Sequence, residues 1–410
     1  MITLLLDLDD TLLDTNMGTF LPAYYEQLSA HLRPLVPPEA MLAALRSGVK
    51  LMDASEDPAR TLRNVFEGDF YPRLGVRADD LRESITTFYE RVFPTLATQT
   101  RHRRGARELI DWAVAAGHRL ALATNPLFPM RATKERIRWA GLDPSCFDLI
   151  SSFETFHFSK SHPAYFAEMM GRLGWPDGPV VMAANDVHRD LVPARRIGLL
   201  TFHVDGAAGT GARSRAPGGL DGAAVHGGSL VDLRTWLAEA PLKSYSPSFK
   251  TKDVVLAVLE ATPGVLEGLT GDLSEEEWKN EASPGDWAIV ELVCHLRDTE
   301  REVHSVQIQT LLESEAPFIA RPDAAVWAKQ RRYLNEDGSA SIREFASARM
   351  AAVQRLKSAA DVTWKKSARH AIFGPTNFLE AVGFMADHDR MHVRQAWNTL
   401  RRLGAGAHRN

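Results

Sequence analysis

The chain has 410 residues, which is more than one hydrophobic core usually supports, so we expect two domains. Apolar residues make up 45% and charged residues 24%, as in ordinary globular proteins. The formal net charge of −4 gives no electrostatic reason to expect a nucleic-acid partner. Two cysteines, Cys146 and Cys294, indicate a reducing compartment without a disulfide framework. Neither a signal peptide nor a membrane-length apolar run is evident, so we expect a cytoplasmic protein with no membrane partner.

The first 240 residues alternate short apolar runs with helical patterns. Apolar runs occupy residues 2–9, 119–125, 148–152, 180–186 and 199–204. Short strands joined by helical crossovers predict a parallel sheet covered by helices on both faces. We therefore predict an α/β, Rossmann-like domain over residues 1–240.

Two segments interrupt this alternation. Residues 16–94 contain no such apolar run and are helical in pattern throughout, which predicts a helical insertion after the first strand. Residues 205–228 contain eight glycines and are predicted to form a mobile loop. The helix expected at 229–237 would close the domain, and the Pro- and Ser-containing run 239–249 is the predicted linker.

Residues 250–410 have little strand character. Amphipathic helical patterns cover 251–268, 286–304, 341–358 and 377–401. These patterns predict an all-α four-helix bundle as the second domain.

Polar side chains follow several of the predicted strands. Since ligands of an open parallel sheet bind outside the carboxyl ends of its strands, we expect these side chains to lie together. Carboxylates, a hydroxyl and an amine at one edge suit Mg²⁺ bound with a phosphate. The residues are Asp7, Asp9, Thr124, Asn125, Lys160, Asp186 and Asp190.

The order of these residues resembles the four motifs of the haloacid dehalogenase superfamily of phosphohydrolases. Its first motif, D-x-D-x-[TV], matches DLDDT at 7–11. The later motifs match Thr124, then Lys160, then the acidic pair Asp186 and Asp190. The resemblance covers about residues 1–240, and the insertion at 16–94 resembles the helical cap of one branch of the family.

Two positions depart from the family pattern. Asn185 stands where many members have glycine, and Ser161 follows Lys160 where proline is common. These departures remove no catalytic group, but Lys160 matches its motif only in part. Lys134 is the alternative cation, although it falls on a predicted helix away from any strand end.

The resemblance implies a mechanism. Asp7 would attack phosphorus and form an aspartyl-phosphate, and Asp9 would act as acid and then base. Phosphoryl binding would fall to Thr124, Asn125 and Lys160, and Mg²⁺ binding to Asp7, Asp9, Asp186 and Asp190. We predict a phosphatase for a small phosphorylated metabolite. A dehalogenase or phosphotransferase is the less favoured alternative, because a departing halide needs no proton from Asp9. Asp10 and Asp14 are expected to be structural.

Three histidines form a second candidate site. His388 and His392 are one helical turn apart on an apolar face, and His295 lies at the edge of another helix's apolar stripe. Three neutral imidazoles would make an open metal site. Asp387 or Asp389 is the expected hydrogen-bond partner of a ring.

This half resembles the DinB/YfiT-like four-helix bundle family, through the run at 286–301, the aromatics Trp327 and Tyr333, and the final H-x3-H. The resemblance implies that His295, His388 and His392 bind a transition metal, with zinc, nickel and iron all open. It also implies a metal-dependent hydrolase or a transferase using a low-molecular-weight thiol. A non-catalytic dimerisation or sensing module is the alternative, and a homodimer is possible. His304 and His370 do not match the pattern and are expected on the surface or in polar networks.

Overall fold

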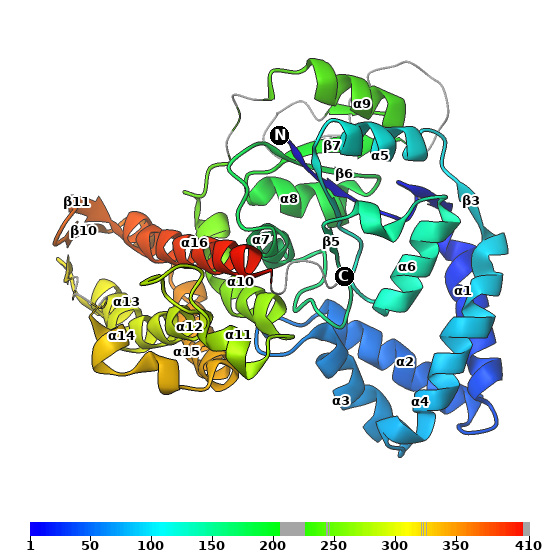
Figure 1. Cartoon of the computed structure of the whole chain (residues 1–410), viewed down its shortest axis with the longest axis horizontal. Coiled ribbons are helices and arrows are strands. Elements are labelled where there is room, and N and C mark those ends of the chain that lie inside the picture. Colours follow the sequence, from blue (N-terminus) through cyan, green and yellow to red (C-terminus); the bar gives the residue numbers. More distant parts are fainter. Residues whose placement is uncertain are drawn as a thin grey trace.

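The computed structural model of the chain describes residues 1–205, 226–242, 245, 247–320, 322, 324 and 326–404. Most of the glycine-rich segment predicted to be a mobile loop lies outside these residues. In the described part, the sheet occupies the centre, the N-terminal helices extend to one side and the C-terminal helices to another (Figure 1).

A parallel sheet forms the centre of the N-terminal half. Among the described residues it has six strands in the order β5-β4-β1-β6-β7-β8. This confirms the predicted Rossmann-like sheet and places the first strand in the middle. The strands are β1 (Thr3–Leu6), β4 (Arg119–Leu122), β5 (Leu149–Ile150), β6 (Val180–Ala184), β7 (Leu200–Val204) and β8 (His226–Gly228).

Helices bury both faces of this sheet. Leu5 packs on the face covered by α7 (Pro163–Arg172) and α8 (Val192–Arg196). Leu4 and Leu6 pack on the opposite face, with α5 (Ala106–Ala115), α6 (Met130–Trp139) and α9 (Leu230–Glu239). Successive side chains of a strand point to opposite faces, so a strand covered on both sides is apolar throughout. The change to aspartate after Leu6 therefore marks the edge of the buried sheet.

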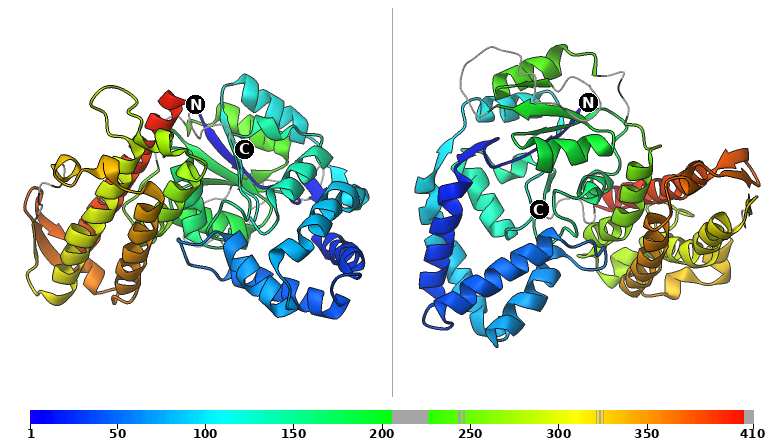
Figure 2. Two further views of the ribbon diagram at one scale, coloured as in Figure 1. Left: turned by 60° about the horizontal axis from the view of Figure 1, so that its bottom comes forward. Right: turned by 180° about the vertical axis from the view of Figure 1, so that it is seen from behind.

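The helical insertion predicted at 16–94 is present. It contains α1 (Met17–Leu32), α2 (Pro38–Asp53), α3 (Leu62–Leu74) and α4 (Ala78–Thr87), followed by a π turn (Phe88–Val92) and a 3-10 helix (Phe93–Gln99). Side chains of Asn16 and Thr61 cap α1 and α3. The antiparallel pair β2 (Leu13–Thr15) and β3 (Thr100–His102) joins this cap to the sheet. The cap lies beyond the carboxyl ends of the strands (Figure 2).

The C-terminal half is helical, as predicted. Its long helices are α10 (Lys252–Thr270), α12 (Ile289–Thr299) continuing through a π turn (Glu300–His304) into α13 (Ser305–Glu313), α15 (Gly338–Lys357) and α16 (Phe378–Leu403). Two short helices, α11 (Glu275–Lys279) and α14 (Trp327–Gln330), lie between them. Among the described residues, no helix combines the length and apolarity that a membrane crossing needs.

A small sheet at the end of this half was not predicted. Strand β10 (Ser367–His370) pairs antiparallel with β11 (Gly374–Asn377) and parallel with β9 (Phe318–Ile319). Strands of two to four residues are too short for a period-2 pattern to stand out in the sequence.

Helix α10 joins the two halves. It was predicted to be amphipathic, but it is buried almost all round because α7 packs on one side and α15 and α16 on the other. Helices α7 and α10 cross closely, since a Cβ at Gly171 would lie 2.6 Å from Val265. The segment before α7 is equally close, since a Cβ at Gly264 would lie 2.6 Å from His157 Nδ1. The predicted segments 1–240 and 250–410 therefore share one continuous apolar cluster.

Candidate active site and metal centre

Asp7 is the centre of the first site. It follows β1 directly, and its buried carboxylate accepts hydrogen bonds from Thr11 Oγ1 at 2.9 Å and from Lys160 Nζ at 2.6 Å. Lys160 Nζ also lies 3.0 Å from Asp190 Oδ1. A single buried ammonium group therefore lies between two carboxylates, although Lys160 is far from both in sequence.

Burial sets the electrostatics of this cluster. It raises the pKa of Asp7, with Lys160 opposing the shift, and raises that of Asp190 to about 7. Burial also disfavours the charged form of Lys160, but the nearby Asp190 and Asp7 outweigh it, so the pKa of Lys160 rises. The raised pKa values mean that Lys160 alone does not offset the cost of burying two carboxylates. The oxygen-rich set thus fits a hard divalent cation such as Mg²⁺.

The other predicted residues reach the same place from neighbouring strand ends. Asp186 follows β6, and its side chain accepts from the backbone N–H groups of His188 and Arg189, which caps the turn carrying Asp190. Asn125 Oδ1 accepts from the Lys160 backbone N–H at 3.1 Å. One cavity is lined by all seven predicted residues, namely Asp7, Asp9, Thr124, Asn125, Lys160, Asp186 and Asp190. Lys134, the alternative cation, lies on α6 and does not line it.

Arg136 is a site residue that the sequence reasoning missed. Its side chain is 1% exposed and forms an ion pair with Asp9, with its guanidinium 4.9 Å from the centre of the Phe128 ring. Arg136 shares a helix face with the buried Ala132 and Thr133. A charged residue on the buried face of a helix indicates a buried ion pair, so the sequence could have identified Arg136.

The two aspartates expected to be structural have such contacts. Asp10 adopts φ of 54°, and its Oδ1 accepts from the Thr15 backbone N–H at 2.9 Å, which supports the tight turn after Asp9. Asp14 is exposed on β2 and lies 3.5 Å from Arg103.

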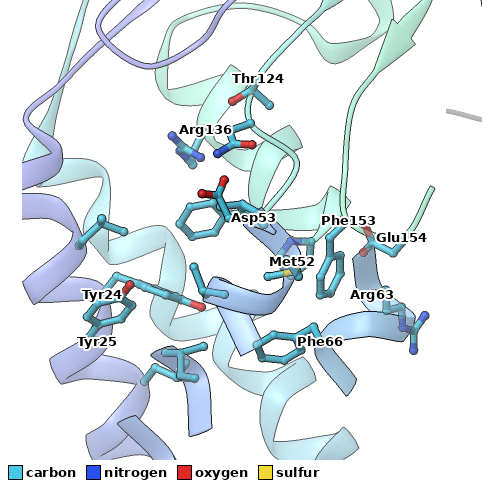
Figure 3. A pocket seen from close by; sticks show the side chains of 18 of the residues that line it. Tyr24, Tyr25, Met52, Asp53, Arg63, Phe66, Thr124, Arg136, Phe153 and Glu154 are labelled. Atoms are coloured by element: carbon cyan, nitrogen blue, oxygen red, sulfur yellow. The ribbon is translucent and has the colours of Figure 1, made fainter. Parts of the chain in front are cut away.

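The cavity extends from Asp7 into the cap. Its volume is about 840 Å³, and we call it the cap cavity. Thr124 lies at one end, and Tyr24, Tyr25 and Phe66 of the cap helices lie at the other, with Phe153 to one side (Figure 3). The catalytic end is therefore polar, whereas the cap end combines aromatic and aliphatic side chains with charged ones such as Arg46, Lys50 and Asp53.

The three predicted histidines meet in the helical half. His295 of α12 and His388 and His392 of α16 each present a ring nitrogen, and these nitrogens all lie within 4.8 Å of one another. The Nε2 atoms of His295 and His388 are 3.2 Å apart. The Trp287 ring is stacked against His392, with 6.0 Å between centroids and 7° between planes.

Burial keeps these imidazoles neutral. It lowers the pKa of His295 to about 4, with the neighbouring His392 and His304 adding to the shift. It also lowers the pKa values of His388 and His392. Within the described residues, the buried Nδ1 atoms of His295 and His388 have no hydrogen-bond partner. Neutral nitrogens gathered in this way fit a transition-metal ion.

A charged network lies behind the histidines. His304 Nδ1 is 3.1 Å from Glu300 Oε2, and Glu300 lies 2.7 Å from Arg349, which also pairs with Asp389. The His304 and His388 rings are 5.4 Å apart between centroids. His304 thus lies in a polar network, which was one of the two predicted environments. It is buried, and its ring lies next to the candidate metal ligand His388. His370 is also buried, and its Nδ1 accepts from the Ile372 and Phe373 backbone N–H groups.

The predicted aspartate partner of a histidine ring is wrong. Asp389 forms an ion pair with Arg349, and Asp387 forms one with Arg390. Instead, His392 Nδ1 lies 3.1 Å from Gln395 Oε1, one turn along the same helix. Spacing along the helix places Asp389 and Gln395 three residues to either side of His392, and the pairing of Asp389 with Arg349 separates the two.

Two stretches of the chain match known families. Residues 2–198 match the family model described as haloacid dehalogenase-like hydrolase, and residues 258–396 match the DinB superfamily. No curated protein sequence matches the chain. The two families thus account for separate stretches of one polypeptide.

Solved structures are similar to parts of the chain. YfiT from Bacillus subtilis, a probable metal-dependent hydrolase, is 22% identical, with 40% of this chain and 97% of YfiT covered and a TM-score of 0.36. A HAD phosphatase from Thermococcus onnurineus is 18% identical, with 58% and 98% covered and a TM-score of 0.36. YfnB from Bacillus subtilis, solved bound to magnesium, is 24% identical, with 49% and 87% covered and a TM-score of 0.33.

Proposed function

Because this chain joins a haloacid dehalogenase-like hydrolase domain to a DinB-superfamily domain, we propose that residues 1–240 form a Mg²⁺-dependent phosphatase acting through an aspartyl-phosphate. The observation that carries the proposal is the buried cluster of Asp7, Lys160 and Asp190 at the carboxyl ends of β1 and β6, open to the cap cavity. The substrate is a phosphorylated metabolite.

Each residue has a role that its position supports. Asp7 attacks phosphorus, and the hydrogen bond from Thr11 together with the contact to Lys160 holds its carboxylate in one orientation. Thr124, Asn125 and Lys160 bind the phosphoryl oxygens, and Lys160 offsets the negative charge that grows during transfer. Mg²⁺, when bound by Asp7, Asp186 and the Asp9 backbone carbonyl, with Asp190 completing the acidic set, supplies further positive charge to the phosphoryl group.

Asp9 is the acid and base. It donates a proton to the leaving oxygen and later takes one from the water that attacks the phospho-enzyme. Arg136 holds the Asp9 carboxylate against α6, and this contact has to open before Asp9 can protonate a leaving group. Arg136 therefore acts on the orientation of Asp9.

The test is phosphate release from a panel of phosphorylated compounds with Mg²⁺. We expect Asp7→Asn to abolish release, and Asp14→Asn, a change at an exposed carboxylate, to leave it unchanged. Release by the Asp7→Asn enzyme at the wild-type rate would overturn the aspartyl-phosphate mechanism. Loss of release on chelation and its return with Mg²⁺ would support the metal requirement.

A second function is supported by the three neutral imidazoles in the helical half. We propose that His295, His388 and His392 hold zinc, nickel or iron, for a hydrolysis or for transfer to a low-molecular-weight thiol. A non-catalytic module for homodimerisation or sensing is the alternative. Metal content and molecular mass of wild type and His392→Ala, with exposed His226→Ala as control, test both. Loss of metal and of a second activity at unchanged mass favours the enzyme, whereas metal retained by His392→Ala rejects the site.

A further inference from the structure

The cap cavity is far larger than a phosphoryl group needs. Its volume of about 840 Å³ is in the range of pockets that enclose drug-sized ligands. The catalytic residues occupy one end only. The remaining walls come mainly from α1, α2, α3 and α4, so most of the space belongs to the cap (Figure 3).

Aromatic rings line this part of the cavity. Tyr24 and Phe128 are 5.4 Å apart between centroids, and Phe66 and Phe153 are 6.2 Å apart. Tyr25 joins them and is only half-buried. Leucine, valine and methionine side chains fill the gaps, including Leu45, Val49 and Met52. These side chains offer dispersion contacts and removal of apolar surface from water.

Neutral hydrogen-bonding groups are few at the cap end. The hydroxyls of Tyr24 and Tyr89 bond to each other at 2.9 Å, and burial raises the pKa of Tyr24 to about 12, so it stays protonated. Glu154 accepts from the Met130 backbone N–H, and Glu67 pairs with Arg63. Several polar groups of the cap end are thus already engaged, although Asp53 Oδ1 is buried without a hydrogen-bond partner among the described residues. A sugar placed against the aromatic walls would leave hydroxyls without partners there, which is costly in a buried site.

We propose that the natural substrate is a phosphate monoester of a large apolar alcohol, whose phosphate binds at Asp7 and whose apolar body fills the cap cavity. This inference rests on the proposed phosphatase. The cavity selects against sugar phosphates because its aromatic and aliphatic walls offer no partners for their hydroxyls. It also selects against short-chain phosphates, which leave the aromatic walls in contact with water.

The experiment compares primary alkyl phosphates with similar leaving-group reactivity. The probes are 2-(2-naphthyl)ethyl phosphate, glucose 6-phosphate and ethyl phosphate, with acetyl phosphate as an activated probe that requires only the catalytic end. We expect kcat/KM for the naphthyl compound to exceed that of the other two esters by about a hundredfold or more, because binding of the apolar body contributes to transition-state stabilisation.

Two variants of one helix locate the selectivity. Val49 lines the cavity, whereas Leu51 lies on α2 outside it and is 43% exposed. Val49→Trp fills the cavity and should reduce the preference for the naphthyl ester over ethyl phosphate at least tenfold. Leu51→Trp adds the same side chain and should keep the preference. If Val49→Trp does not fold, Tyr25→Ala should lower the preference by removing a wall.

The outcomes separate the two proposals. Hydrolysis of acetyl phosphate that depends on Asp7, with equal kcat/KM for the three esters or a preference for glucose 6-phosphate, overturns the substrate class and leaves the phosphatase standing. No Asp7-dependent hydrolysis of any probe, acetyl phosphate included, overturns both. An equal preference in Val49→Trp and Leu51→Trp also rejects the cap cavity as its source.

Discussion

At the carboxylate site a buried lysine lies between Asp7 and Asp190, whereas at the histidine site burial keeps three imidazoles neutral. The first site places its charges beside the reacting group. The second keeps charge away from the candidate ligands, in the network of Glu300, Arg349 and Asp389. Burial disfavours charge at both sites, but with different consequences: the carboxylates need a counter-ion, whereas the imidazoles become neutral ligands.

The largest effect is expected at Lys160. Lys160→Met leaves Asp7 and Asp190 buried without their shared cation and removes a stabilising charge from the transition state. We expect phosphate release to fall about 10²–10³-fold, as measured by kcat. Lys134→Met, which removes a lysine outside the cavity, is the matched control. A Lys160→Met enzyme within threefold of wild type would contradict the role of this cation.

Arg349 tests how much the buried network behind the histidines contributes to the stability of the fold. Arg349→Met leaves Asp389 buried without its ion-pair partner and leaves Glu300 with His304 alone. We expect it to lower the free energy of unfolding by about 3–5 kcal/mol. Arg301→Met removes only an exposed ion pair with Glu344 and should cost less than about 1 kcal/mol. Urea unfolding measures both. Equal losses in the two variants would mean that the buried network contributes no special stability.

A smaller, pH-dependent effect is expected at the junction of the two regions. His157 lies 2.8 Å from Glu168 of α7 and 2.9 Å from Glu267 of α10. Burial alone would lower its pKa, but Glu168 and Glu267 raise it to about 9, above the value of 6.5 in an unfolded chain. The stabilisation is therefore fully present below pH 6.5 and is lost as the pH rises through 9.

The size of this effect is about 2 kcal/mol, less than the pKa shift alone implies, because Glu267 is partly exposed. We expect the free energy of unfolding to fall between pH 6 and pH 10 by this amount more in wild type than in His157→Gln. Parallel pH curves for the two proteins would show that the histidine does not link α7 to α10 electrostatically.

Local patterns explain why much of the molecule was predictable. The parallel sheet follows from the spacing of its apolar runs, and the convergence of Asp7, Thr124 and Asp186 follows from the common direction of the strands. His388 and His392 face the same way because they are one turn apart on α16. The chemical roles of these residues are proposals, because a position in the fold does not identify a reaction.

The sequence by itself determined which residues end the strands and which share a helix face, because strand and helix periodicity depend only on near neighbours in the chain. The tertiary structure alone decided which distant groups meet: Arg136 with Asp9, Glu267 with His157, and Arg349 with Asp389. Each of these pairs joins elements whose relative placement depends on the packing of the whole core, and no local pattern encodes that placement. For the same reason α10 was predicted as an ordinary amphipathic helix, although both halves of the molecule bury it.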